Sequence, residues 1–405
     1  MLRSMFTAIN SLGSHQLFLD VVADNLANAN TVGFKSSRVS FQTQFAQMMQ
    51  VGTGPTADLG GINPLQIGLG VRMGAVSPVF SQGALQGTNR NSDLAIQGDG
   101  FFIYAGGGQN YYSRDGGLQM DAEGYLVHGS TGLRLQGWTA ITSGSTATID
   151  TGMPIGGIQL PFDTALARAT TNATVGGNLS SETAIGDSFD VTMGVYDSLG
   201  VLQSITVTYT RTANDTWDWA ASGNGATGTG TVTFDTDGQY VSGGGQITIP
   251  GTNGAANTVF DLDLTGMTML ADDSTAALLN QDGLAAGTFN SFFVAPGSGE
   301  IYGVYSNGMQ QLLGQVALAN FVNPDGLIRT GQNMWQESVN AGAAQVGAPA
   351  SGGNGAIASG YLEGSNVDMA QEFTNMILAQ RGFQASSRVI TTSDEILQEL
   401  VNLKR

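Results

Sequence analysis

The chain has 405 residues, enough for two or three domains with cores of their own, and a formal net charge of −18 at pH 7. This acidity argues against nucleic acid and anionic membrane surfaces as partners, and the lack of cysteine excludes disulfides, thiolate chemistry and cysteine metal sites. Only 11% of the residues are charged, against about 25% ordinarily, and 59 of the 405 are glycine, about twice the usual share of roughly 7%. A surface with so few charges suits either packing against copies of the same chain or a secreted β-rich protein.

The N-terminal segment, 1–34, is predicted to contain a helix over about 2–27, because apolar residues seven apart share one helix face. Two stripes follow this interval: Leu2, Ile9, Gln16 and Ala23, and Met5, Leu12, Leu19 and Leu26. Asn28, Asn30 and Gly33 tolerate the left-handed backbone that ends many helices. Polar residues interrupt each apolar run, so we expect no cleavable signal and no membrane insertion. Such a chain is either cytoplasmic or exported without a cleaved signal.

The middle of the chain is predicted to be β-structure. Residues 35–70, rich in glycine and proline, are expected to form an extended connector that could hold a short helix near 40–50. From residue 71 onward, short alternating runs separated by Gly, Asn and Asp predict strands and hairpins, for example over 188–196 and 202–210. Residues 148–285 hold many acids and only two bases, so we interpret them as a second β domain inserted between 71–147 and 286–340.

A second small and polar connector, 341–364, leads to the C-terminal segment, 365–405, which is predicted to be helical. We expect Ser365 and Asn366 to cap this helix, with Asp368 in its first turn. Its apolar stripe again has the seven-residue interval: Met369, Met376, Phe383, Ile390 and Leu397. The predicted fold is therefore multi-domain and mainly β, with two nested sandwich-like or barrel-like β domains and two terminal helices that pair as a coiled-coil inner domain.

Motifs for chemistry are weak, so we predict no enzyme, no catalytic, cofactor-binding or metal-binding residues and no cofactor. Residues 223–228 match the GxGxxG pattern of dinucleotide-binding sites. They lead into a predicted strand, so no helix N-terminus is available to bind a pyrophosphate. The Asp235–Gly238 stretch lacks the acidic end of a calcium loop and is interpreted as a turn. His15 and His128 are the two histidines, and neither has a nucleophile elbow beside it. A carboxylate pair could be sought among Asp187, Asp190 and Asp197, but we interpret these three acids as scattered on the surface.

Two stretches near the chain ends are distinctive: DNLANANTVGFK at 24–35, and SNVDMA at 365–370 followed by NMILAQR at 375–381. They resemble the N-terminal and C-terminal signatures of the rod–hook axial protein family of the bacterial flagellum. The signature residues are Asn25, Leu26, Ala27, Asn28, Gly33, Phe34, Lys35, Ser365, Asn366, Val367 and Asp368. VYDSLG at 195–200 and LGQVALANF at 313–321 resemble the hook members, whereas Phe383 stands where relatives often have Tyr.

This resemblance implies a structural subunit of the hook. Such subunits assemble into a curved tube that joins rod to filament as a universal joint and encloses an export channel. The implied partners are copies of the chain, the distal rod protein, the hook cap protein, the hook–filament junction protein and the flagellar type III export apparatus. Two alternatives stay open: a distal rod protein, or an extracellular β-rich adhesin with Trp217 and Trp219 as a binding platform.

Overall fold

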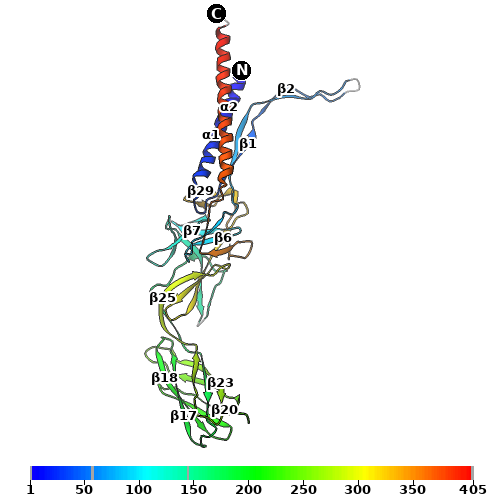
Figure 1. The fold of residues 1–405 in the computed structure, drawn as a ribbon. Coiled ribbons are helices and arrows are strands. Elements are labelled where there is room, and N and C mark those ends of the chain that lie inside the picture. Colours follow the sequence, from blue (N-terminus) through cyan, green and yellow to red (C-terminus); the bar gives the residue numbers. More distant parts are fainter. Residues whose placement is uncertain (1, 56–58, 144–145, 403–405) are drawn as a thin grey trace.

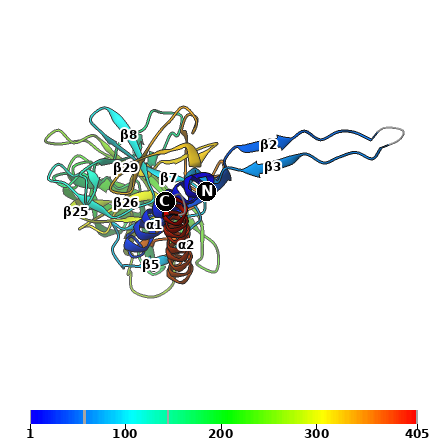
Figure 2. The same cartoon turned by 90° about the horizontal axis from the view of Figure 1, so that it is seen from above.

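The computed structural model describes residues 2–55, 59–143 and 146–402 of an elongated molecule (Figure 1). Two helices stand at one end together with both chain termini, a β unit follows, and a second β unit occupies the opposite end. A long hairpin projects sideways beside the helices (Figure 2). Within the described residues, no helix is both long and apolar enough to cross a lipid bilayer.

Helices α1 (Leu2–Ala27) and α2 (Met369–Asn402) form an antiparallel pair. The α1 bounds are those predicted from the sequence. Close approaches fix the register of the two helices. Ser386 Oγ donates to Ser11 Oγ at 3.0 Å, and one turn further along, Gly382 lies so close to His15 that a Cβ atom would come within 2.5 Å of the imidazole ring. The pair is therefore held by small residues at its centre.

A two-part antiparallel hairpin, hereafter the arm, spans most of the predicted connector, 35–70, and continues to residue 78 in the segment predicted to begin the inner β domain. Its base is formed by β1 (Ser37–Thr43) and β4 (Val71–Pro78), and its outer part by β2 (Ala46–Gln50) and β3 (Leu65–Gly68). The base packs on α1, where Phe18 and Phe41 meet edge to face at 5.6 Å. The suggestion of a short helix near 40–50 is wrong, because the residues there pair across the arm as β1 and β2.

The inner β unit is built on a branched 14-stranded sheet. Strand β7 (Phe101–Gly106) lies near its centre and is buried on both faces. Phe102 and Tyr104 enter one hydrophobic cluster while Phe101 and Ile103 enter another. A sheet covered on both faces explains why this strand is continuously apolar rather than alternating.

The main path of this sheet is β15 (Ala165–Arg168), β25 (Leu284–Val294), β26 (Glu300–Tyr305), β27 (Gln310–Val316), β11 (Arg134–Thr139), β7, β8 (Gln109–Ser113), β30 (Met334–Gln336) and β29 (Ile328–Gly331). Its branches are β9 (Leu118–Met120), β10 (Leu126–His128), β14 (Gly156–Gly157), β28 (Leu318–Asn320) and β31 (Gln345–Gly347). A short 3-10 turn, η1 (Pro324–Gly326), precedes β29.

Three small pairs complete this part of the molecule: β12 (Ile141–Ser143) with β13 (Thr146–Thr148), β6 (Leu94–Gln97) with β32 (Ala356–Ser359), and β5 (Leu85–Gly87) with β33 (Tyr361–Glu363). The last two pairs bind the segment predicted as the second connector to the start of the inner unit. The chain thus returns to the inner unit before α2 begins. The domain boundaries drawn from the sequence stay a prediction.

The outer β unit contains two sheets that share one core, which confirms a mainly β, sandwich-like region. One sheet is the antiparallel meander β17 (Ser188–Tyr196), β18 (Leu202–Arg211), β19 (Thr216–Ser222), β20 (Thr229–Phe234) and β21 (Tyr240–Ser242). The other has the order β22 (Gly245–Ile249), β23 (Thr258–Thr268), β16 (Asn172–Asn178) and β24 (Ala277–Gln281), with β16 and β23 parallel.

Two sequence interpretations of the outer unit need correction. Trp217 and Trp219 are 0% and 1% exposed in the shared core, so they cannot serve as a binding platform and this support for an adhesin is lost. Asp197 is buried rather than scattered on the surface, and its carboxylate accepts hydrogen bonds from the backbone N–H groups of Leu199 and Val201. That carboxylate shapes the turn between β17 and β18.

Candidate functional site

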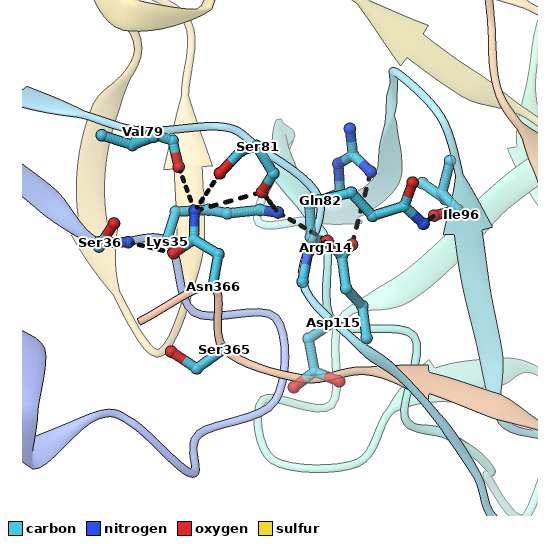
Figure 3. A network of polar contacts seen from close by, with 12 residues as sticks. Lys35, Ser36, Val79, Ser81, Gln82, Ile96, Arg114, Asp115, Ser365 and Asn366 are labelled. Carbon is cyan, nitrogen blue, oxygen red and sulfur yellow. Dashed lines mark hydrogen bonds and ion pairs between the residues drawn. The ribbon is translucent and has the colours of Figure 1, made fainter. Parts of the chain in front are cut away.

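The signature residues of both chain ends meet where the helical pair joins the inner unit, and Figure 3 shows the polar contacts there. Lys35 Nζ lies 2.7 Å from Glu363 Oε1 and donates a second hydrogen bond, of 2.8 Å, to the Ser81 carbonyl. The Lys35 and Glu363 side chains are both 0% exposed. A buried charge is tolerated only when it is paired and hydrogen-bonded, so this contact ties the end of the N-terminal signature to β33.

Arg114, which follows β8, completes a buried charge cluster around Glu363. Its Nη1 lies 3.4 Å from Glu363 Oε2 and donates to the Gly98 carbonyl at 2.8 Å. Burial lowers the pKa of the Lys35 ammonium from its ordinary value, and the Glu363 carboxylate opposes this shift. Glu363 therefore serves two cations at once, and it also accepts the backbone N–H of Gly83.

Asn366 fastens the other signature to the base of the arm. Its Oδ1 accepts the Ser36 N–H at 2.8 Å, and its Nδ2 donates to the carbonyls of Val79 and Ser81 (Figure 3). The prediction that Ser365 and Asn366 cap the C-terminal helix is wrong. Asp368 holds that position, because its Oδ1 accepts the N–H groups of Ala370 and Gln371.

Two residues of the N-terminal signature position the chain between α1 and the arm. The Asn25 side chain bonds both backbone groups of Ser37 and reaches Glu372 of α2 at 3.2 Å. Gly33 has a φ of +68° and lies against Asp115, where a Cβ would come within 2.6 Å of the backbone N. Together with Lys35 and Asn366, these contacts make the junction one hydrogen-bonded unit, which we call the junction cluster.

The predicted stripes lie beside the centre of the helical pair rather than at it. Half-buried stripe residues flank the contact: Met5, Leu12, Leu19, Leu26, Met376, Phe383, Ile390 and Leu397. Exposed stripe residues face away: Ile9, Gln16, Ala23 and Met369. The side chain of Leu2 lies outside the described residues. The fully buried helix residues are mostly small: Ala8, Ser14, Val22, Asn25, Ala379, Ser386 and Ser393. Whether the stripes meet neighbouring copies stays a prediction.

The helices and the arm expose large apolar side chains beyond these stripes. Phe6 is 62% exposed and Phe45 of the arm is 84% exposed. Similar side chains continue along both elements: Leu17, Phe373, Ile377, Leu378, Val389, Ile396, Met48, Met49, Ile62, Leu65 and Ile67. Many exposed large apolar side chains on the same two elements indicate an interaction surface.

The described residues contain no group of three or more His, Asp or Glu side chains that could hold a metal ion. His128 is buried with its Nε2 3.1 Å from Asp115 Oδ2, and His15 packs against Gly382. These contacts give both histidines a structural role in holding segments of the chain together. Sequence reasoning missed Arg114 and Glu363, the two other members of the charge cluster. The only available signal was that a charged residue, Glu363, stands two positions before the signature in a chain with few charges.

Four family models match parts of the chain. "Flagella basal body rod protein" matches 5–35, and "Flagellar hook protein FlgE/F/G D1 domain" matches 95–177. "Flagellar basal body protein FlaE D2 domain" matches 167–284, and "Flagellar basal body rod FlgEFG protein C-terminal" matches 358–403. The models for the two ends cover both halves of the junction cluster.

Curated relatives match over nearly the whole chain. The flagellar hook protein FlgE of Borreliella burgdorferi is 36% identical, with 100% of each chain covered, and that of Salmonella typhimurium is 33% identical, covering 99% of this chain and 100% of that one. The flagellar basal-body rod protein FlgG of Bacillus subtilis is 32% identical with 100% of both covered. The crystal structure of Helicobacter pylori flagellar hook protein FlgE2 aligns with a TM-score of 0.48 at 14% identity, covering 69% of this chain and 100% of that one.

Proposed function

Since the chain belongs to the flagellar hook protein FlgE family and is a structural subunit of the hook, we propose that it forms a curved, flexible tube that transmits torque. The distal rod alternative has less support, because the relatives named above are mostly hook proteins, although the rod protein FlgG also matches over its full length. The tube would act as a universal joint and enclose a channel for exported protein.

The observation that carries the proposal is the exposed apolar surface of the helical pair. Its own contact buries mainly small residues, while Phe6, Ile9 and Ile377 keep about half or more of their surface exposed. Full burial of an exposed side chain of this size contributes roughly 1.5–3 kcal/mol, so covering the exposed half of each would contribute about half of that. Copies of the same chain supply the matching apolar stripes, so polymerisation is the simplest way to bury them.

The outer unit supports the mechanical part of the proposal. Its core is closed within the unit. Acids are numerous between residues 148 and 285, but Arg168 and Arg211 are the two bases there, so few ion pairs could form between the outer units of neighbouring copies. Contacts made by short uncharged side chains can slide with little loss, because no strong ion pair has to break. Helices would therefore hold the inner layer, while outer units shift as the tube bends.

We propose the remaining partners because the chain belongs to the hook protein family. We place the tube outside the cell, between the distal rod protein and the hook–filament junction protein, with a hook cap protein at the growing end. We propose the flagellar type III apparatus as the export route. These assignments follow from the family and from the axial position of the hook.

Electron microscopy of the purified full chain under polymerising conditions tests the proposal. Curved tubes are expected; straight tubes would favour a rod protein, and no tubes at all would contradict self-assembly. Ile9→Asp should abolish tubes while leaving the β units folded, because a carboxylate enters the exposed stripe. Ile185→Asp is the matched control, since Ile185 is similarly exposed on the outer unit. Normal tubes from Ile9→Asp would reject the helix stripe as the contact.

A further inference from the structure

A groove lies where α1, the base of the arm and the inner unit come together. Its volume is about 510 Å³. On the α1 side it is lined by Leu17, Asp20, Val21 and Asp24, which follow one face of the helix. The opposite walls come from the arm and from the segment around β29: Ser37, Met73, Val76, Pro78, Asp325, Leu327, Arg329 and Trp335. The lining is thus mainly apolar and includes three carboxylates.

The three carboxylates that line the groove have too few basic partners within the chain. Arg329 is the single base among the lining residues, and it is engaged already. Its guanidinium lies 3.2 Å from Asp24 Oδ2 and 4.7 Å from the centre of the Phe34 ring. No ion pair joins Asp20 or Asp325 to a described residue. An apolar groove with two free carboxylates selects a partner surface that is apolar and basic.

One face of α2 has this composition. Leu378, Arg381, Ala385, Arg388 and Val389 follow each other at intervals of three, four, three and one, so they share one side of the helix. All five are exposed, and neither arginine forms an ion pair with a described residue. Between Phe373 and Ser393 the sequence has no acid. This face is hereafter the basic face of α2.

We propose that the groove of one copy receives the basic face of α2 from a second copy. Arg381 and Arg388 would meet Asp20 and Asp325, and the neighbour's Leu378 and Val389 would cover Leu17 and Val21. The chain's own α2 cannot do this, because the contact of Ser386 with Ser11 turns its small-residue side toward α1. The proposal rests on the proposed function and names the surfaces through which neighbouring subunits join.

The geometry of this contact suits an open polymer. The groove and the basic face are different surfaces of one chain, so the contact is head-to-tail rather than two-fold. Head-to-tail contacts that do not close into a ring repeat as a helical filament. Each added subunit would bring a fresh groove and use a fresh helix face, which is what elongation of a tube requires.

Charge exchange tests the pairing with the full chain. Asp20→Lys with Asp325→Lys should make the groove repel arginines, and Arg381→Glu with Arg388→Glu should make the helix face repel the acids. We expect each double variant alone to lower the yield of tubes at least tenfold at low salt. The quadruple variant, and an equimolar mixture of the two doubles, should restore tubes because every contact then pairs opposite charges. Asp187→Lys with Asp237→Lys on the outer unit controls for net charge.

Circular dichroism of each variant monomer verifies that it is folded before assembly begins. Double variants that assemble like the parent would overturn the pairing. So would a quadruple variant that stays monomeric although both β units are folded. If the unaltered chain itself forms no tubes, the proposed function fails rather than this contact, so the two failures are distinguishable.

Discussion

The outer unit and the helical pair differ in where they place their large apolar side chains. The outer unit buries its large side chains, with Trp217, Trp219, Tyr209 and Phe260 all inside one core. The helical pair buries mainly alanine and serine and leaves several large apolar side chains at the surface: Phe6, Ile9, Phe373, Ile377 and Ile396. The first region is complete as a single copy, whereas the second has apolar surface that only other molecules can cover. One chain thus combines a self-sufficient fold with a region built for assembly.

Removing the centre of the outer core should give the largest loss of stability. Trp217→Ala deletes a fully buried indole and is expected to cost about 3–5 kcal/mol of the free energy of unfolding of the outer unit. Calorimetry should show one transition moving to lower temperature. Tubes should still form below that temperature, because the helices are unchanged. Loss of tubes while the outer unit is folded would remove the distinction between the two regions.

The junction cluster should be the most sensitive point outside the outer core. Glu363→Gln leaves Lys35 and Arg114 buried without a counter-charge, which we expect to cost about 3 kcal/mol. The loss should affect the inner unit, the end of α1 and the start of α2, and hydrogen exchange there should accelerate. Glu123→Gln is the control, since Glu123 and its partner Arg134 are solvent-exposed and such pairs contribute about 1 kcal/mol or less. Equal losses from both variants would contradict the role of burial.

The small-residue centre of the helical pair predicts an intermediate effect. Ser386→Leu adds a large side chain at a buried position opposite Ser11 and should destabilise the pair by about 1–3 kcal/mol. Gln380→Leu makes an apolar change on an exposed part of α2 and should leave the pair intact. Helical circular dichroism of the polymer and the critical concentration for assembly measure both effects. A stabilising Ser386→Leu would place the helix contact elsewhere.

The smallest effect is expected at neutral pH from Tyr209→Phe. Burial raises the pKa of the Tyr209 hydroxyl, which has no hydrogen-bond partner among the described residues. In the unfolded chain a tyrosine ionises near pH 10, so the outer unit should lose stability as pH rises above about 10 and be unaffected below it. Tyr209→Phe should weaken that alkaline loss. An unchanged alkaline midpoint would show that other groups control it.

The sequence predicted the elements whose pattern is local. The bounds of α1 and the strand 188–196 were evident because the apolar period of each is unbroken. The outer part of the arm was missed, because β2 and β3 are exposed along their whole length and show no alternation of burial. Strand β4 falls in the region from residue 71 onward that was predicted to form strands. Lys35 was singled out only by resemblance, Asn366 by resemblance and by a helix-cap prediction that is wrong, and Glu363 was missed. Their roles depend on contacts between residues about 330 positions apart, which no local pattern reveals.

Hydrogen exchange measured on the monomer and on the assembled polymer tests the central claim most directly. The account predicts that amides of α1 and α2 exchange rapidly in the monomer and become protected by orders of magnitude in the polymer, while amides of β17 to β20 exchange alike in both. Helices already as protected in the monomer as the outer strands would contradict it, because their apolar surface would then need no other copy.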